Sequence, residues 1–210
     1  MLAAAMCVSC ASGARPVARA GCPRGDVLVS GQAHAEALRG CTRIDGDLTV
    51  RTGAAIDLDG LAALEDVTGS VVIGPSIGLD TLDDFGRLRA IGGTLRLVAN
   101  GDITAAFFPA LERAGAVAVD SNLAMTQAMF PALREVAGGL TVRDNGALEL
   151  IDLTRLARVG ATLAVENNRI LADIWLGAAR ADAVQVAGNP ALDSETHGRL
   201  LATAAPHPGS

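Results

Sequence analysis

Apolar residues recur in one short pattern between residues 44 and 192 of this chain. The pattern is clearest in residues 136–148, VAGGLTVRDNGAL, where an apolar residue precedes a glycine turn, an apolar-polar-apolar strand, an Asn and another apolar residue. The strand positions alternate, so two side chains point to one face and the residue between them points to the other. One such unit cannot bury its own apolar face and must stack on copies of itself. The pattern therefore predicts a repeat protein.

Seven copies of the strand define the period. The first inward residues of the strands are Leu48, Val71, Leu95, Val117, Leu140, Leu163 and Val184. The second inward residues are Val50, Ile73, Leu97, Val119, Val142, Val165 and Val186. A period of about 23 residues lies in the range of leucine-rich repeats. We therefore predict a mostly β solenoid of about seven rungs, with parallel strands ~4.8 Å apart.

An Asn column is predicted at one corner of the rungs. A carboxamide both donates and accepts hydrogen bonds, so a ladder of Asn side chains can satisfy buried turn groups. The column consists of Asn100, Asn122, Asn145, Asn168 and Asn189, with Gly53 and Ser76 in the two earliest rungs.

On the back of each rung, apolar residues recur at spacings of three, which favours a helical or 3₁₀ turn or an irregular arc. One column of this back consists of Leu61, Phe85, Phe108, Phe130, Leu153 and Leu176. We interpret its Phe residues as core, because the same column continues as Leu. An aromatic binding stripe is the alternative.

The two ends of the repeat region have the features of caps, which solenoids need because a terminal rung otherwise exposes core. Residues 26–30 predict a first strand and residues 32–39 a short helix. The predicted solenoid spans residues 26–192, with an N-terminal cap at 26–43. Residues 193–210 form a C-terminal cap and tail, with a helix expected over 194–205.

Residues 1–12 are short, apolar and rich in small residues, which indicates a signal or lipoprotein leader before a Gly/Pro/Arg linker at 13–25. The run is too short to span a bilayer. Cys10, preceded by Ser9, is the candidate for lipidation, and Cys7 is the alternative. Simple cleavage of the leader is also compatible with the sequence. Cys7 and Cys10 share the spacing of a redox or metal pair, but no second pair accompanies them.

Cys22 and Cys41 flank the first predicted strand and helix. Two Cys at this spacing, at the start of a solenoid, suggest a disulfide that closes the N-terminal end. Such a bond implies an oxidising compartment. Two buried free thiols are the alternative.

Composition narrows the class of protein further. At 210 residues the chain is expected to form one domain. Its net charge of −6, with all basic residues being scattered Arg, argues against a nucleic-acid partner. An apolar content of 50% with only 2% aromatic residues suits a core of stacked aliphatic side chains.

The repeats resemble the receptor L domain family of receptor ectodomains, fungal cell-wall proteins and bacterial surface lipoproteins. The resemblance covers about residues 22–192. It rests on Cys22, Cys41, Ile44, Gly46, Leu48, Val50, Val67, Gly69, Val71, Ile91, Gly93, Leu95, Val136, Gly138, Leu140, Asn189 and Leu192. It implies a right-handed, single-stranded parallel β-helix of leucine-rich-repeat character whose usual role is extracellular binding.

No catalytic constellation stands out, and we expect neither an enzyme nor a bound cofactor or metal. His34, His197 and His207 lie in the predicted caps and tail, and we interpret them as solvated. The acid pairs Asp57/Asp59 and Asp83/Asp84 have oxygen ligands suited to Ca²⁺, but they lack the spacing of a calcium loop. We interpret them as solvated turn acids.

The outward strand positions form the candidate binding face. Its residues are Arg51, Arg96, Asp120, Thr141, Arg143, Glu166 and Gln185. Asp120, Arg143 and Glu166 fall on consecutive rungs and predict an acid-base-acid ladder. Charge compensation explains this ladder better than a glycosidase carboxylate pair, because Arg143 would keep both acids ionised. Trp175, the single Trp, is expected either to pack against the C-terminal cap or to serve as a surface contact.

These observations predict an exported protein, either secreted or held at the cell surface or outer membrane through a lipidated Cys. We expect a monomer that binds a protein or a glycan through its solenoid. A structural envelope component without a discrete ligand is the first alternative. A β-helix enzyme acting on polysaccharide is the second.

Overall fold

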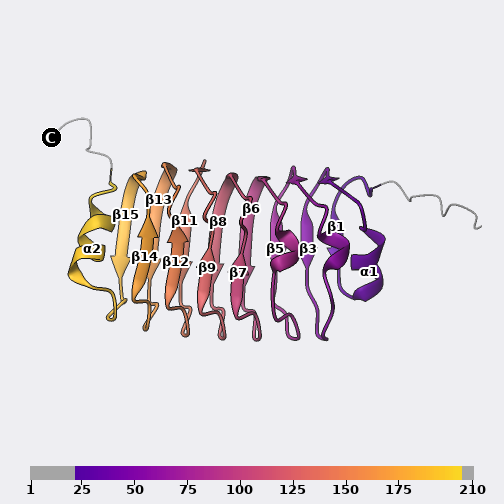
Figure 1. Ribbon diagram of the computed structural model, residues 1–210, viewed down its shortest axis with the longest axis horizontal. Helices are drawn as coiled ribbons and strands as arrows, with labels where there is room; N and C mark the ends of the chain where they lie inside the picture. The colour runs from indigo at the N-terminus through magenta and orange to yellow at the C-terminus, as the bar shows by residue number, and fades with distance from the viewer. Residues whose placement is uncertain (1–21, 205–210) are drawn as a thin grey trace, which may run out of the picture.

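The computed structural model describes residues 22–204 of the chain. Strands stack side by side along one long axis, with a short helix at each end (Figure 1). The larger sheet of this part of the chain, called the long sheet below, has eleven strands paired in parallel. Four of its strands are long, with eight or nine residues each: β6 (Ala90–Val98), β8 (Arg113–Asp120), β13 (Arg158–Glu166) and β15 (Arg180–Ala187). Its shorter strands are β1 (Val27–Val29), β2 (Arg43–Ile44), β3 (Leu48–Val50), β4 (Asp66–Val67), β5 (Val71–Ile73), β10 (Glu135–Val136) and β11 (Leu140–Arg143).

The register of the long sheet follows the predicted columns. Leu48 pairs with Val71, Val71 with Leu95, and so on through every rung to Val184. Most of these inward residues are fully buried, because each side chain packs on its equivalents above and below. The predicted mostly β solenoid of about seven turns is confirmed.

A second sheet of four parallel strands lies on the back of the later rungs. Its strands are β7 (Ala105–Phe107), β9 (Gln127–Met129), β12 (Leu150–Leu153) and β14 (Asp173–Leu176). In the earlier rungs the back forms the predicted 3₁₀ turns, as η1 (Asp59–Leu61) and η2 (Asp83–Phe85). In the later rungs the spacing of three forms a single turn, in which the N–H of Leu111, for example, donates to the carbonyl oxygen of Phe108. The strand before each of these turns was not predicted, because outward residues there, such as Phe107, are apolar and hide the period-2 alternation.

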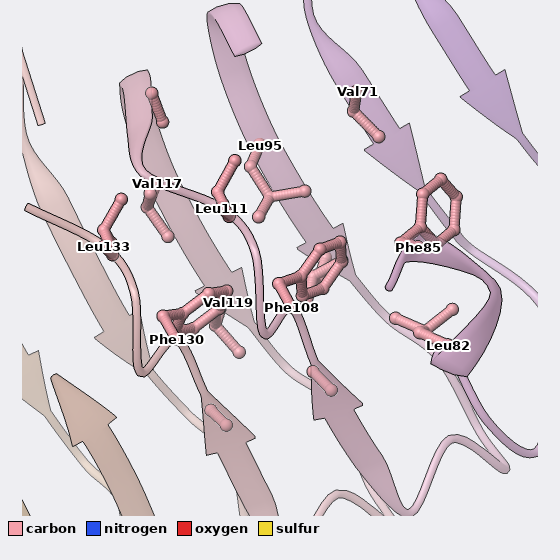
Figure 2. Close-up of a cluster of buried hydrophobic side chains, with 14 of the residues drawn as sticks. Val71, Leu82, Phe85, Leu95, Phe108, Leu111, Val117, Val119, Phe130 and Leu133 are labelled. Atoms are coloured by element: carbon pink, nitrogen blue, oxygen red, sulfur yellow. The ribbon is translucent and has the colours of Figure 1, made fainter. Parts of the chain in front are cut away.

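The Phe column is a core spine, as predicted. Phe85, Phe108 and Phe130 point into the coil between the two sheets (Figure 2), and each is at most 1% exposed. Consecutive ring centroids are 5.6 Å apart in stacked geometry. Aromatic pairs at this separation stabilise the fold by about 0.5–1.5 kcal/mol beyond their burial. The spine thus ties three adjacent rungs together.

The Asn corner column also forms. The side-chain amide of each Asn from Asn100 to Asn168 donates to Oδ1 of the next Asn, at 2.9–3.2 Å. In the earlier rungs the backbone N–H of Thr52 donates to the hydroxyl of Ser76. Thr52 therefore occupies the first corner in place of the predicted Gly53. This rung is one residue shorter between its strand and its corner than the rungs that follow.

Both ends of the solenoid carry a helix. α1 (Gln32–Ala37) packs against β1 and η1, and α2 (Ser194–Leu201) packs against β14 and β15. The carboxylate of Asp193 accepts from the backbone N–H of Thr196 and begins α2. The predicted Cys22–Cys41 disulfide is present and fastens the N-terminal end.

Several predictions fall outside the described residues. These are the leader, most of the linker, Cys7, Cys10 and His207. Among residues 22–204, no helix has the length and apolar character needed to cross a membrane.

Candidate functional site

The predicted binding residues share the outer side of the long sheet, because each stands between or just after two inward positions. Arg51, Arg96, Arg143 and Gln185 are exposed, and Thr141 and Glu166 are half-buried. In register, Arg96 is followed by Ala118, Thr141, Ala164 and Gln185, one from each successive rung. We call this set of outward residues the long-sheet face. Its centre is low and flat because the residues beside Thr141 are Ala.

The predicted charge ladder forms only in part. Nε of Arg143 lies 3.1 Å from Oδ1 of Asp120, and this ion pair joins neighbouring strands. Glu166 is also in register with Arg143, but among the described residues no ion pair joins the two. Asp120 is only 6% exposed, so its carboxylate holds Arg143 in place and offers little surface to a partner.

A second group of acids gathers where the back of the coil is irregular. Carboxylate oxygens of Asp57, Asp59 and Asp84 lie within 4.8 Å of one another, which within residues 22–204 makes this the one such grouping of metal-type ligands. They line a hollow of about 630 Å³ beside α1. Burial raises the pKa of Asp84, and the neighbouring carboxylates of Asp59 and Asp57 raise it further.

The convergence of these acids was not predicted, because Asp84 lies one rung beyond Asp57 and Asp59. Local bonds explain part of the arrangement. The Asp57 carboxylate accepts from the backbone N–H of Asp59, and Gln32 accepts from the N–H of Asp57. Asp57 and Asp59 are exposed, in keeping with the interpretation as solvated turn acids, whereas Asp84 is half-buried.

The outer side of the four-stranded sheet carries larger side chains than the long-sheet face. Phe107, Met129, Asp152 and Trp175 occupy one outward row in successive rungs. Trp175 is 50% exposed, so of its two predicted roles the structure favours the surface position. The signal for this row was present in the sequence, since Phe107 directly precedes the core residue Phe108. It was missed because the back of the rung was not predicted to be a sheet.

A disulfide-closed parallel solenoid with two uncovered sheet faces has the architecture of a binding module. The family model for the receptor L domain matches residues 40–145, about half of the chain. The chain therefore belongs to the receptor L domain family. No curated protein and no solved structure matches the chain. The family is extracellular, non-enzymatic and binds protein ligands, which indicates a ligand-binding, ectodomain-like role for this chain.

The described coil continues beyond the match with the same inward columns in register. β13 and β15 pair from Arg158 and Arg180 onward, with one register shift between Val159 and Thr162 that leaves Leu163 opposite Val184. β14 adds a fourth strand to the back sheet. The rungs after residue 145 thus extend the same faces that the matched rungs form.

Proposed function

We propose that this protein is an exported binding module that holds a protein partner on its long-sheet face. The observation that carries the proposal is the flat centre around Thr141, set between the exposed guanidinium groups of Arg96 and Arg143. Flat solenoid sheets present rows of side chains to partners. Arg is among the residues that contribute most to binding in protein interfaces.

The ion pair with Asp120 supports this role for Arg143. A long side chain that is already held in one orientation loses less conformational freedom when a partner binds. The guanidinium remains half-exposed in the pair, so it has donors left for a carboxylate on the partner. The neighbouring Ala118 and Ala164 allow a partner's backbone to approach closely. A protein with acidic side chains around a flat apolar patch has the matching chemistry.

A protein partner fits this face better than a glycan does. Sugar rings stack on exposed aromatic side chains, and the long-sheet face has none among its outward residues from Arg51 to Gln185. A catalytic role for Asp120 and Glu166 as a carboxylate pair is disfavoured, because Arg143 lies between them in register and is ion-paired with the Asp120 carboxylate.

Export and surface attachment are part of the proposal. The Cys22–Cys41 disulfide supports an oxidising compartment, since such bonds persist outside the cytosol. Lipidation of Cys10 would then tether the module to the cell surface or outer membrane, and cleavage without lipidation would release it. Labelling cells with a palmitate analogue tests the tether. Cys10→Ala should abolish the label, and loss of the label in Cys7→Ala instead would assign the anchor to Cys7.

Site-specific cross-linking tests the binding face. A photo-reactive amino acid at Thr141 should capture one protein partner on intact cells. The same group at Ala157, an exposed residue at another corner of the coil, is the matched control and should capture nothing. Equal capture from both positions, or capture from Ala157 alone, contradicts the proposed face.

A further inference from the structure

We propose that the outer side of the four-stranded sheet is a second docking surface, for a protein segment that carries both apolar and basic side chains. This surface lies on a different sheet from the long-sheet face, so the proposal stands independently of the proposed function. We call it the back-sheet face. It comprises the outward residues of β7, β9, β12 and β14 and the acids beside them.

Apolar side chains occupy the middle of the back-sheet face. Phe107 and Met129 are adjacent in register and half-buried, and Leu150 follows in the neighbouring row. Trp175 ends the row at the C-terminal edge with half of its surface exposed. Figure 1 shows these four strands side by side. η2 packs against β7 at one edge of the sheet, and α2 packs against β14 at the other. Aromatic rings and a thioether on one exposed sheet face are typical of protein interfaces.

Acidic side chains surround this apolar centre. Asp83 lies in η2 beside β7, Glu149 directly precedes β12, and Asp173 begins β14. Asp152 lies within the apolar row, where its carboxylate accepts from the backbone N–H of Thr154. Residues 80–83, 104–107, 126–129, 149–153 and 172–176 contain no Arg, Lys or His. Arg199 of α2 reaches the sheet edge, where its guanidinium donates to the carbonyl oxygen of Ile174 and contributes one positive charge.

Charge complementarity therefore selects the occupant. Asp83, Glu149 and Asp173 form no ion pair within the described residues and outnumber Arg199. A rim that is acidic on balance attracts cationic groups, and an apolar centre attracts aliphatic or aromatic ones. A protein segment that alternates the two kinds of side chain meets both requirements. The negative charge disfavours an anionic membrane surface. A neutral glycan would use the rings but leave the acids without partners.

The size of the face sets the length of the segment. Four parallel strands span ~14 Å at ~4.8 Å per strand. An extended chain of about four or five residues covers that distance at ~3.3 Å per residue. A short basic and apolar stretch, rather than a whole domain, is thus enough to fill the face.

Trp175 gives a direct readout, because it is the only Trp in the chain and lies on the face itself. The probe is a synthetic peptide of eight alternating Arg and Leu residues, without aromatic residues of its own. Titration into the whole protein should give a saturable blue shift of the Trp175 emission. The same peptide with Glu in place of Arg should give none.

Two pairs of variants test the location of peptide binding. The double variant Glu149→Gln with Asp173→Asn should weaken binding of the peptide roughly three- to tenfold, because the two changes remove two charges of the acidic rim. Glu36→Gln with Asp182→Asn removes the same charge from exposed positions elsewhere and should leave the affinity unchanged. Both pairs alter only exposed side chains, so the fold is retained, and thermal melts check this. Met129→Gln tests the apolar part and should also weaken binding.

Three results would overturn the proposal. If the two double variants weaken peptide binding equally, the peptide is attracted by the overall negative charge of the protein and not by this face. An equal fluorescence shift with a neutral oligosaccharide would make the face a glycan surface. Absence of any shift with the Arg/Leu peptide would exclude the face as a site for such segments. Capture of a partner from Thr141 is unaffected by any of these outcomes, so the two proposals fail separately.

Discussion

Asn122 and Asn145 are joined twice. The backbone N–H and the side-chain amide of Asn122 both donate to Oδ1 of Asn145, at 3.0 and 3.1 Å. Both residues are fully buried. The same double contact recurs from Asn145 to Asn168 and from Asn168 to Asn189. The corner of the solenoid is therefore one continuous hydrogen-bonded column, in which each member satisfies the backbone of the rung beside it.

Removing a central member of this column should destabilise the fold strongly. Asn145→Ala deletes three bonds that the amide donates, to Val119, Arg143 and Asn168, as well as the two that Oδ1 accepts. Buried groups left without partners cost about 1–3 kcal/mol each, with partial relaxation. We expect a loss of about 3 kcal/mol in the free energy of unfolding, measured by urea denaturation.

The end of the column provides the control. Oδ1 of Asn100 accepts no hydrogen bond from the described residues, so Asn100→Ala removes fewer bonds than Asn145→Ala. Its cost should be clearly smaller. Equal losses for the two variants would mean that the column does not act through these bonds.

The residue before each corner Asn adopts a left-handed backbone. Ala99 has φ 52° and Gly188, at the equivalent position, has φ 67°. The left-handed region costs an L-residue roughly 1–2 kcal/mol, and glycine avoids that cost. Glycine also loses about 0.5–1 kcal/mol more conformational freedom on folding. Ala99→Gly should therefore raise the free energy of unfolding by up to about 1 kcal/mol.

Gly188→Ala is the reciprocal variant. Its new Cβ would meet the side-chain Oδ1 of Asn167 in addition to the unfavourable backbone angle. We expect a lower melting temperature for this variant and a higher one for Ala99→Gly, both measured by calorimetry. Melting temperatures that move in the same direction would contradict this account of the corner.

The disulfide should contribute a large share of the stability of the N-terminal end. Cys22 and Cys41 are 19 residues apart, and closing a loop of that size stabilises a fold by about 3 kcal/mol in the chain-entropy model. Replacing both by Ser should lower the free energy of unfolding by that amount. The double variant should also become insensitive to reductant, whereas a melt of the native protein should shift when reductant is added.

Asp84 should make the protein less stable as the pH rises, whereas most acids in folded proteins have the opposite effect. Its pKa is raised in the folded protein, so folding favours the protonated form. That contribution is complete below the unfolded pKa of about 3.9 and is lost as the pH rises through the folded value. At neutral pH the charge is therefore destabilising. Asp84→Asn should stabilise the protein by roughly 0.2–1 kcal/mol at pH 7.

The gain from Asp84→Asn should disappear near pH 3, where Asp84 itself is protonated. Urea denaturation at the two pH values measures the difference. Asp182→Asn, at an exposed site on the last strand, has the same change of charge and is the control. A gain in Asp84→Asn that is identical at both pH values would exclude the titration of Asp84 as its cause.

The sequence predicted the long sheet because its inward residues are large and apolar while the residues between them are small or polar. Leu48, Val71 and their equivalents could be aligned by spacing alone, and so could Asn100 to Asn189. The disulfide followed from two Cys at the start of the repeats. These features recur in every rung, which makes them visible without an alignment of relatives.

Features that depend on contacts between rungs of different length or local structure could not be predicted from the sequence. Ala105–Phe107 has no polar alternation, so the back sheet was hidden. Asp84 meets Asp57 only because two early rungs have 3₁₀ turns in place of strands. The burial of Asp120 depends on how Arg143 folds over it. The corner at Thr52 differs from its predicted neighbour Gly53 because one rung is a residue shorter than the rest.

The central claim is that the partner binds the flat centre of the long-sheet face. The most direct test fills that centre with a large side chain and measures the affinity for the partner that is captured from Thr141. Ala118→Trp places a large ring between Arg96 and Thr141 in register. It should weaken partner binding at least about tenfold, which corresponds to ~1.4 kcal/mol. Ala137→Trp, at an exposed position away from this face, should bind with unchanged affinity. Unchanged binding by Ala118→Trp, with its fold intact, would contradict the account.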